Sequence, residues 1–389
     1  MNFDFSNEQK DIQKAVREFA EAEFTKDYVI EHEKNSRFPR DVMEKAAKLG
    51  FLTIDVPEKY GGAGYGLMEK AIALEELCRA GGGLGASLGG APFASKVVLR
   101  CGSEEQKNKY LPLACSGDGL PFIGAFTEPD KGTDLVTYPL GTTAKKNGDD
   151  YLINGTKTFI THGDTCKFCV ILCQTDVDAK PAYRGQSTFI IEDPVKQKGY
   201  TVSLFDKMGW HTSATTQISL SDLRVPKDNL VGAESRGFYN IISFISEFRV
   251  ETGAMGVGMA QGAFERALNY AKTREAFGKK IGSFQTISHK IADMATRIET
   301  ARLIVYKAAF MFDTYHEISP ALSSMAKWYA ARVAVDVADD AIEIMGGHGY
   351  MLENDVERFY RDARSLELVE GTREAQKNSI AGQLLGKLG

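Results

Sequence analysis

The sequence of 389 residues has no apolar run of the length that spans a membrane, and it has no excess of basic side chains. Lysine and arginine number 47 against 52 aspartates and glutamates, so the formal net charge is -5. This balance argues against a basic face for nucleic acid, and 43% hydrophobic residues is typical of a soluble globular protein. The length exceeds what one hydrophobic core accommodates, so we expect two or three domains.

Groups that could hold a metal are few and scattered. Six cysteines are too few for a disulfide scaffold in a chain of this length. Cys166, Cys169 and Cys173 could ligate zinc or an iron–sulfur cluster, but their run lies in an apolar stretch and has no fourth ligand nearby. We interpret these thiols as small hydrophobic core residues. The six histidines form no H-x-x-x-H pair, so we expect no metal site.

The N-terminal segment MNFDFSNEQK is polar and acidic and lacks the apolar centre of a signal peptide. Helix signals begin at Ser6, so little sequence is left for a targeting segment. These features predict a cytoplasmic protein of bacterial type. A mature mitochondrial matrix protein given a new initiating methionine would show the same pattern.

Residues 1–120 are predicted to form helices. Ser6 followed by Gln9 is a capping box, and DVMEKAAKLGFL has a helical pattern that Gly50 stops. The segments YGGAGYG and AGGGLGASLGGAPFAS are interpreted as glycine-rich breaks. Neither has the GxGxxG spacing after a strand, which argues against a dinucleotide-binding fold.

Residues 121–232 are predicted to form strands. The dipeptides Asn147-Gly148 and Asn154-Gly155 flank YLI and indicate hairpin turns. Short β-branched segments follow between polar turns: FCVILC, STFII, YTVSLF and TQISL. The pattern is typical of a compact antiparallel β unit such as a small barrel.

From residue 233 the pattern returns to helix. Apolar residues recur there at intervals of three and four, namely Ile291, Met294, Ile298, Ala301, Ile304 and Ala308. This seam is typical of a helical bundle. Small residues in GAMGVGMAQGAF permit close helix packing, and Gly346-Gly347 is expected to end another helix.

Six motifs together resemble the acyl-CoA dehydrogenase family of flavoenzymes, in particular its short- and medium-chain type. They are FTEPDKGTD (126–134), INGTKTFIT (153–161), TREAFGKKIGSFQ (273–285), EIMGGHGY (343–350), RFYRDAR (358–364) and VEGT (369–372). The resemblance covers nearly the whole chain. It implies an α+β multidomain fold with an N-terminal α-helical domain (1–120), a middle antiparallel β-barrel domain (121–232) and a C-terminal four-helix bundle (233–389).

The resemblance implies α,β-dehydrogenation of an acyl-CoA thioester with FAD as cofactor. Glu370 matches the base that removes the α-proton while the β-hydrogen leaves as hydride to flavin N5. Gly371 would let the backbone approach the substrate, and the Glu370 N–H with a flavin ribityl hydroxyl would form an oxyanion hole. From the residues alone, Glu370 could instead cap a helix. Glu247 and Glu251 remain alternative bases, because other branches of the family carry theirs just before an arginine that matches Arg249.

The contacts that the resemblance implies map onto many positions. Expected FAD contacts are Phe126, Thr127, Thr133, Phe159, Thr161, Arg274, Phe277, Gln285, Glu343, Gly346, Gly347, Thr372 and Glu374. Expected substrate contacts are Thr133, Arg249, Val369 and Gly371. Arg274 matches an arginine that reaches FAD of a neighbouring subunit, which implies a homotetramer.

The resemblance also implies an electron-transferring flavoprotein as electron acceptor. Oxidases of the family give electrons to oxygen, but they are usually much longer chains. A catalytically silent binding or assembly subunit is an alternative function. Retention of Glu370, Thr161 and Arg274 together argues against that alternative.

The sequence departs from the family pattern at several positions: Gly124, Lys131, His162, His211, Val369 and Arg373. Val369 replaces a frequent tyrosine beside the base. Residues 81–95, which match a segment lining the acyl pocket in the family, are mostly glycine, alanine and serine. These departures predict a wide pocket for branched, cyclic or aryl acyl-CoA substrates.

Overall fold

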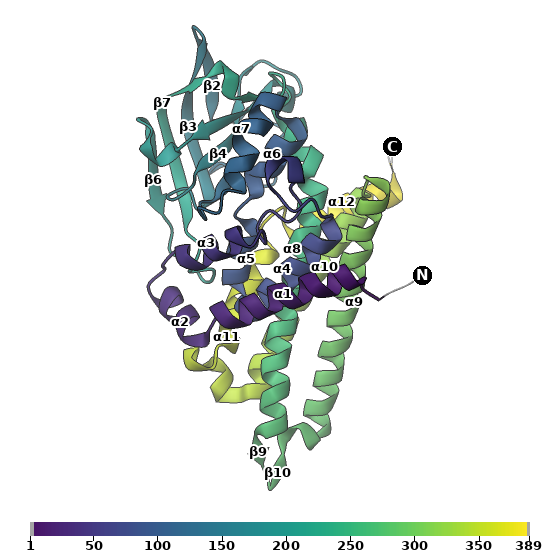
Figure 1. Cartoon of the computed structure of the whole chain (residues 1–389). Coiled ribbons are helices and arrows are strands. Elements are labelled where there is room, and N and C mark those ends of the chain that lie inside the picture. The colour runs from purple at the N-terminus through teal and green to yellow at the C-terminus, as the bar shows by residue number, and fades with distance from the viewer. Residues whose placement is uncertain (1–3, 387–389) are drawn as a thin grey trace.

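The computed structural model describes residues 4–386, and its first unit is helical (Figure 1). Its helices are α1 (Asn7–Glu23), α2 (Lys26–Lys34), α3 (Arg40–Lys48), α4 (Leu67–Gly81), α5 (Gly83–Gly90), α6 (Phe93–Cys101) and α7 (Glu104–Ala114). Ser6 and Gln9 form the predicted capping box of α1. Gly50, with a φ of 78°, follows the end of α3. Both predicted helix boundaries are confirmed.

The second glycine-rich segment is helical, which corrects its interpretation as a break. Helix α4 continues to Gly81, Gly82 with a φ of 56° separates it from α5 (Gly83–Gly90), and Ala91-Pro92 separate α5 from α6. A Cβ on Gly89 would lie 2.1 Å from Cδ2 of Leu74 on α4. Because a side chain is missing there, α5 lies directly on α4, and this packing outweighs the low helix propensity of glycine.

The middle unit is a β-sheet. Its strands are β1 (Phe122–Ala125), β2 (Thr143–Asn147), β3 (Asp150–Thr161), β4 (Phe168–Gln174), β5 (Gln186–Glu192), β6 (Tyr200–Leu204), β7 (Thr215–Pro226) and β8 (Leu230–Val231). The strand order is β6-β7-β3-β2-β4-β5-β8, and β1 pairs with β4. Most pairs are antiparallel as expected, whereas β1 and β2 lie parallel to β4. Cys169 and Cys173 on β4 are fully buried in the core, as their interpretation required.

One of the two predicted hairpin turns is present. Asn147, at the end of β2, pairs with Asp150, so the loop between β2 and β3 is Gly148-Asp149, one residue after the predicted dipeptide. The prediction for Asn154-Gly155 is wrong, because this dipeptide stays inside β3 where the register against β7 shifts. A Cβ on Gly155 would lie 2.4 Å from Cα of Thr142. The glycine therefore allows a bulge in a close-packed strand.

The C-terminal unit is a helical bundle. Its helices are α8 (Gly237–Thr273), α9 (Gln285–Tyr315), α10 (Pro320–Met345) and α11 (Val356–Leu366), and α12 (Arg373–Leu385) follows them. The short strands β9 (Glu275–Ala276) and β10 (Lys279–Lys280) join α8 to α9. The predicted seam of α9 lies in the core, and Gly346 ends α10 as predicted.

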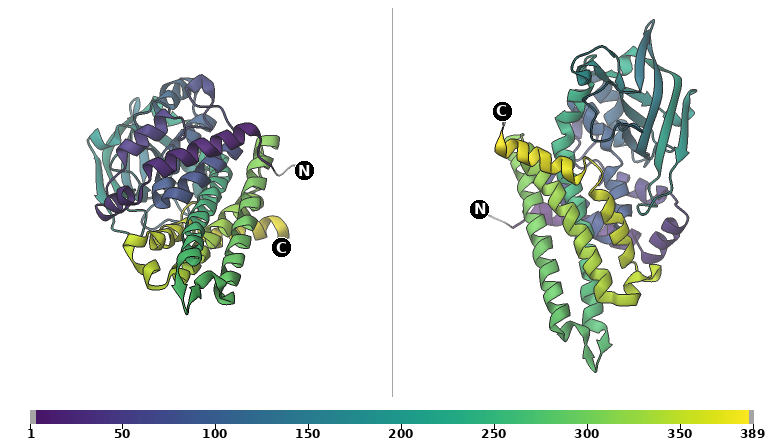
Figure 2. Two further views of the ribbon diagram at one scale, coloured as in Figure 1. Left: turned by 60° about the horizontal axis from the view of Figure 1, so that its bottom comes forward. Right: turned by 180° about the vertical axis from the view of Figure 1, so that it is seen from behind.

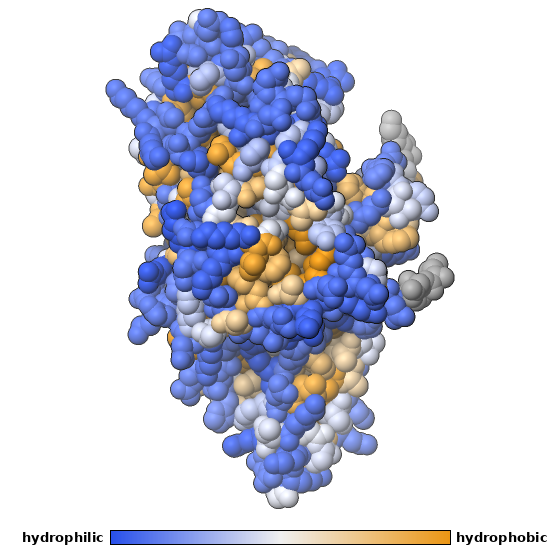
Figure 3. Space-filling model, in the orientation of Figure 1, coloured by the Kyte–Doolittle hydropathy of each residue, from blue (hydrophilic) through white to orange (hydrophobic). Residues whose placement is uncertain are grey.

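The sheet lies at one end of the molecule, and the bundle extends away from it to the β9–β10 tip (Figures 1 and 2). Figure 3 shows a mainly hydrophilic face with apolar side chains exposed in the region between α1 and α3. Helix α8 packs on both α4 and α10 because it carries glycine at the contacts. A Cβ on Gly258 would lie 2.2 Å from the carbonyl oxygen of Glu75 on α4. Within residues 4–386, none of the helices combines the length and apolarity needed to cross a membrane.

Candidate active site

Glu370 lies in a left-handed turn between α11 and α12. The φ angle is 53° at Glu370 and 93° at Gly371. Thr372 caps α12 by accepting a hydrogen bond from the Ala375 N–H at 3.4 Å. The cap is therefore Thr372, and the Glu370 carboxylate is left free for another role. A positive φ at a non-glycine residue is uncommon and persists only when its surroundings hold it.

Two fully buried side chains hold this turn. The side-chain amide of Gln376 donates to the carbonyl oxygens of Glu370 and Gly371, at 2.9 Å each. The ammonium group of Lys327, on α10, donates to the Gly371 carbonyl at 2.8 Å. The backbone around the carboxylate is thus fastened from α12 and from α10.

The Glu370 carboxyl is in an environment that favours its neutral form. Burial raises the pKa of Glu370 to about 7, even though the positive charges of Lys327 and Arg249 act to lower it. The negative charge of Glu251 adds to the rise. Among the described residues, no cation lies within the 4.0 Å that defines an ion pair with Glu370. A carboxyl with this pKa can take up or release a proton near neutral pH.

The two alternative bases, Glu247 and Glu251, form ion pairs with basic residues of α6. Glu251 lies 2.5 Å from the Lys96 Nζ, and Glu247 lies 2.8 Å from Arg100 Nη2. Lys96 also contacts Asp55 at 2.7 Å, so these groups form a buried cluster between α6 and α8. The ion pairs fasten the N-terminal unit to the bundle, whereas Glu370 has no such pair among the described residues.

Helix α8 carries Arg249, whose charge acts on Glu370, and it contributes to a group of aromatic rings. Arg249 Nη1 donates to Ser324 Oγ at 3.2 Å, and its buried Nε has no partner among the described residues. The preceding residue, Phe248, has its ring 4.6 Å from that of Phe93. Phe93 also lies 5.2 Å from Phe244 and 5.9 Å from Phe126. We name these four rings, Phe93, Phe126, Phe244 and Phe248, the phenylalanine cluster.

The residues expected at the flavin ring are brought together at the end of β3. Phe159 has a φ of 57° and an unusually exposed ring, at 67%, beside Phe205 at 5.6 Å. Thr161 ends the same strand and is exposed. The Thr127 carbonyl accepts from the Thr158 N–H at 2.9 Å, which holds the Phe126–Thr127 segment against this strand. Thr133 is exposed on the loop between β1 and β2.

A second set of predicted cofactor residues lies at the opposite end of the bundle. Arg274 and Phe277 belong to the β9–β10 tip, where Phe277 is 95% exposed, and Gln285 begins α9. Glu343, Gly346 and Gly347 end α10 near this tip, because His348 lies 5.8 Å from Tyr270 of α8. Within one chain the structure does not bring this set to Phe159 and Thr161 (Figure 1).

The glycines of α5 do not open the space that the wide-pocket prediction assumed. Gly89 packs on Leu74, and a Cβ on Gly85 would lie 2.3 Å from the Leu77 carbonyl oxygen. Helix α4 therefore fills the volume beside both glycines. Gly90 differs, because a Cβ there would meet no described atom within 4 Å. Of these three glycines, only Gly90 therefore leaves open space beside it.

His162, one of the departures from the family pattern, is buried at a junction of units. Its Nε2 lies 3.0 Å from Ser87 Oγ of α5 and 3.3 Å from Ser213 Oγ of the loop before β7. Burial lowers the pKa of His162 to about 3, so the ring is neutral at physiological pH. His162 directly follows β3 and links its end to the N-terminal helices.

Three family models match the chain: the acyl-CoA dehydrogenase N-terminal domain over residues 6–118, the middle domain over 124–223 and the C-terminal domain over 235–385. The caffeyl-CoA reductase-Etf complex subunit CarC of Acetobacterium woodii is 39% identical, over 98% of this chain and all of that protein. The chain belongs to the acyl-CoA dehydrogenase family. It is an oxidoreductase of the type that dehydrogenates acyl-CoA.

Two further comparisons agree with this family membership. The 3-(aryl)acrylate reductase of Clostridium sporogenes is 37% identical, over 98% of this chain and 99% of that protein. The structure of butyryl-CoA dehydrogenase from Megasphaera elsdenii superposes with a TM-score of 0.93 at 33% identity, covering 99% of this chain and all of that one. The three-unit fold is therefore that of the family.

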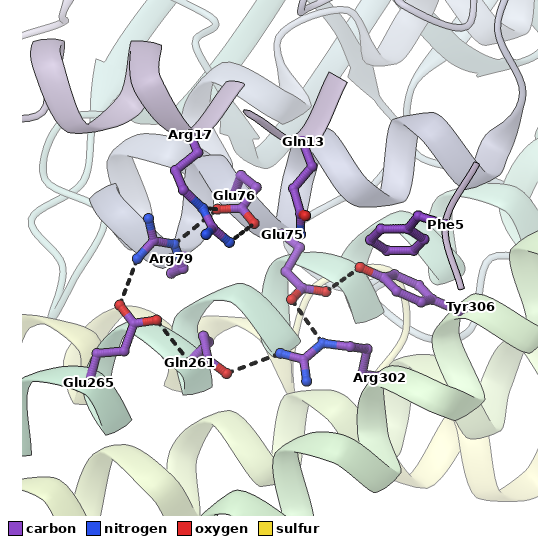
Figure 4. A pocket seen from close by; sticks show the side chains of 10 residues that line it. All are labelled: Phe5, Gln13, Arg17, Glu75, Glu76, Arg79, Gln261, Glu265, Arg302 and Tyr306. Carbon is purple, nitrogen blue, oxygen red and sulfur yellow. Dashed lines mark hydrogen bonds and ion pairs between the residues drawn. The ribbon is translucent and has the colours of Figure 1, made fainter. Parts of the chain in front are cut away.

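A cavity of about 200 Å³ between α1, α4, α8 and α9 contains none of the predicted site residues (Figure 4). Its charged side chains are bonded to one another. Arg302 pairs with Glu75 at 3.0 Å, Arg79 with Glu265 at 2.6 Å, and Arg17 with Glu76 at 2.7 Å. These paired charges fasten four helices together, so we assign the cavity a structural role in the acyl-CoA dehydrogenase fold.

Sequence reasoning missed Lys327 and Gln376, the two side chains that hold the Glu370 turn. A signal for Lys327 was present, because this charged residue lies among the small buried residues Ala326, Ala330 and Ala331 of α10. A lysine inside an apolar helix face needs a partner in the core. For Gln376 the sequence carries no comparable signal.

Proposed function

We propose that this acyl-CoA dehydrogenase uses FAD, with Glu370 exchanging the α-proton of a branched, cyclic or aryl acyl-CoA thioester. The observation that carries the proposal is the state of Glu370. Its carboxyl has a pKa raised to about 7 by burial, sits on a fastened left-handed turn, and has no ion pair among the described residues. The alternative bases Glu247 and Glu251 are held by Arg100 and Lys96.

The end of β3 suits a flat aromatic cofactor such as the flavin of FAD. Phe159 offers an exposed apolar ring, and Thr161 places a hydroxyl on the same strand end. Lys157 Nζ donates to the Phe126 carbonyl at 3.0 Å, so the neighbouring segment with Thr127 is fixed in place. FAD held there by Phe159, Thr161 and Thr127 would supply the hydride chemistry of the reaction.

The residues of the chain supply the remaining chemistry. Because the Glu370 carboxyl is near half-ionised at pH 7, it is a stronger base than a solvent-exposed glutamate and takes the α-proton. The N–H of Glu370, in its left-handed turn, is proposed to donate to the thioester oxygen where negative charge develops. The unpaired Nε of Arg249 supports a role for that residue in binding the substrate.

The phenylalanine cluster favours aryl substrates within the proposed class. Two of its rings, Phe244 and Phe248, stand on α8, the helix that also carries Arg249. Aromatic rings prefer edge or offset contacts with other rings, worth roughly 0.5–1.5 kcal/mol each beyond the buried area. Two relatives act on aryl groups by name, the caffeyl-CoA reductase subunit and the 3-(aryl)acrylate reductase.

An electron-transferring flavoprotein is the proposed redox partner, since the CarC relative is named as part of a reductase-Etf complex. A homotetramer is proposed because the β9–β10 tip lies far from the strand β3 in the same chain (Figure 1). Residues of this tip could reach FAD only across a subunit contact. Arg274 would then pair with the negatively charged diphosphate.

The test is turnover of FAD-loaded enzyme on a panel of acyl-CoAs with an artificial electron acceptor. The panel contains phenylpropanoyl-, cyclohexanecarbonyl-, isobutyryl-, butyryl- and octanoyl-CoA. We expect the highest kcat/KM for phenylpropanoyl-CoA, with a second place for the cyclic or branched substrate. A clear preference for butyryl- or octanoyl-CoA would refute the proposed substrate class.

Glu370→Gln tests the base in the same assay. The change is nearly isosteric, so FAD and substrate should still bind while turnover falls by on the order of 10²–10⁴-fold or more. Glu247→Gln is the matched control on α8, because its partner Arg100 lies outside the proposed site. Near wild-type turnover of Glu370→Gln would show that another group is the base.

A further inference from the structure

Lys327 is a fully buried lysine that bonds to the residue following the proposed base. Its Nζ donates to the Gly371 carbonyl at 2.8 Å, next to the residue that carries the carboxylate. Burying an ammonium group is expensive unless charges and hydrogen bonds compensate. An uncharged residue would occupy this position on α10 without that cost. We therefore infer that the charge of Lys327 has a role.

Two carboxylates, Glu367 and Glu370, act on Lys327, and they differ in whether they form ion pairs with other residues. Glu367, at the end of α11, is bonded by Arg364 and lies 3.7 Å from Arg332 and 3.8 Å from Arg373. Glu370 has no such partner among the described residues. Of the charges that act on Lys327, that of Glu370 is the largest and favours the ammonium form.

One face of α10 organises both cations beside Glu370. Ser324 and Lys327 are three residues apart and so lie on the same side of the helix. Ser324 accepts from Arg249, and Lys327 donates to Gly371. The charged groups that face Glu370 or Lys327 are Arg249 and Glu251 from α8 and Glu367 from α11, and Gln376 of α12 is neutral.

We propose that Lys327 is a positioning residue for the reaction: its buried ammonium group holds the left-handed turn through the Gly371 carbonyl and supplies the positive charge that faces the Glu370 carboxylate. The inference rests on the proposed role of Glu370 as base. The hydrogen bond holds the backbone of the turn that carries the carboxylate, and the charge favours its ionised form.

The charge of Lys327 changes the pKa of Glu370 in one direction, downward. Lys327 lowers the pKa of Glu370 against the larger effect of burial, which raises it. Burial lowers the pKa of Lys327 itself to about 8, so the group is mainly charged at pH 7. Without the cation the base would hold its proton to higher pH.

Two variants separate the charge from the hydrogen bond. Lys327→Gln removes the charge and keeps an N–H donor, whereas Lys327→Met removes both. In each variant the acid limb of kcat/KM should move to higher pH, by about 1–3 units, the usual effect of one nearby opposite charge. At pH 7 this lowers kcat/KM by about fivefold or more. Lys327→Gln should recover at high pH, and Lys327→Met should keep a deficit at every pH because the turn has lost a bond.

A second readout does not depend on turnover. The carboxyl band of Glu370, identified by its loss in Glu370→Gln, can be titrated by difference infrared spectroscopy. We expect protonated Glu370 to persist to higher pH in both Lys327 variants. Lys70→Met is the matched control, since Lys70 is another buried lysine that donates to a carbonyl, that of Leu52 at 2.6 Å. It should lower stability without moving the pH profile or the band.

An unmoved acid limb and an unmoved infrared band in both Lys327 variants would overturn the inference, even if activity fell equally at all pH values. That result would make Lys327 a packing residue only. Retained turnover in Glu370→Gln is a different result, since it would refute the base assignment on which the inference rests.

Discussion

The buried ion pair of Lys157 and Glu128 holds the loop that carries Phe126 and Thr127, and replacing Lys157 by methionine should release it. Lys157 is fully buried and lies 2.9 Å from Glu128, and its Nζ also donates to the Phe126 carbonyl. Removing one partner of a buried pair costs about 3–5 kcal/mol, because the other charge stays buried and unpaired.

Two other bonds to Glu128 place the expected cost at the lower end of that range. The N–H groups of Gly141 and Thr142 donate to this carboxylate at 2.7 and 2.8 Å and survive the substitution. We therefore expect Lys157→Met to lower the free energy of unfolding by about 3 kcal/mol. FAD affinity should fall as well, because the Phe126–Thr127 segment loses one of its anchors.

Urea unfolding of the single variants and of Lys157→Met/Glu128→Gln gives a double-mutant cycle. The Glu128→Gln change removes the orphaned charge, so the double variant should lose less than the sum of the two single changes, with a coupling on the order of 2 kcal/mol. A loss below about 1 kcal/mol in Lys157→Met, the range of exposed pairs, would refute the reasoning. Additive losses would show that the two groups do not interact.

Three further predictions follow from the described contacts. Wild-type kcat/KM should fall as the pH drops through about 7, because burial raises the pKa of Glu370 and its protonated form cannot accept the α-proton; a profile that stays flat to about pH 5 would contradict this. Gly89→Val should destabilise the fold by about 1–3 kcal/mol through its clash with Leu74, while Gly90→Ala should be nearly neutral in thermal unfolding. Equal melting temperatures for these two variants would argue against the close α4–α5 contact. Arg274→Ala should reduce FAD retention and the oligomeric state together, measured by flavin absorbance and gel filtration, and a variant that stays yellow and fully assembled would rule out the cross-subunit role.

Several features were predictable because they depend on residues close together in the chain. The capping box of Ser6 and Gln9 and the turn that follows Asn147 depend on local backbone chemistry. The buried seam of α9 follows from helical periodicity. The family resemblance points to Glu370 on local grounds too, since VEGT is a contiguous motif.

Other features depended on partners that are distant in the sequence. The glycine-rich segment 83–90 is a helix because α4 lies against it, and Asn154-Gly155 is a bulge because β7 and Thr142 pack beside it. The sequence alone determined that a carboxylate would stand at Glu370. Only the tertiary structure decided its chemistry, because the burial that raises its pKa and the bonds from Lys327 and Gln376 come from side chains that the fold brings together.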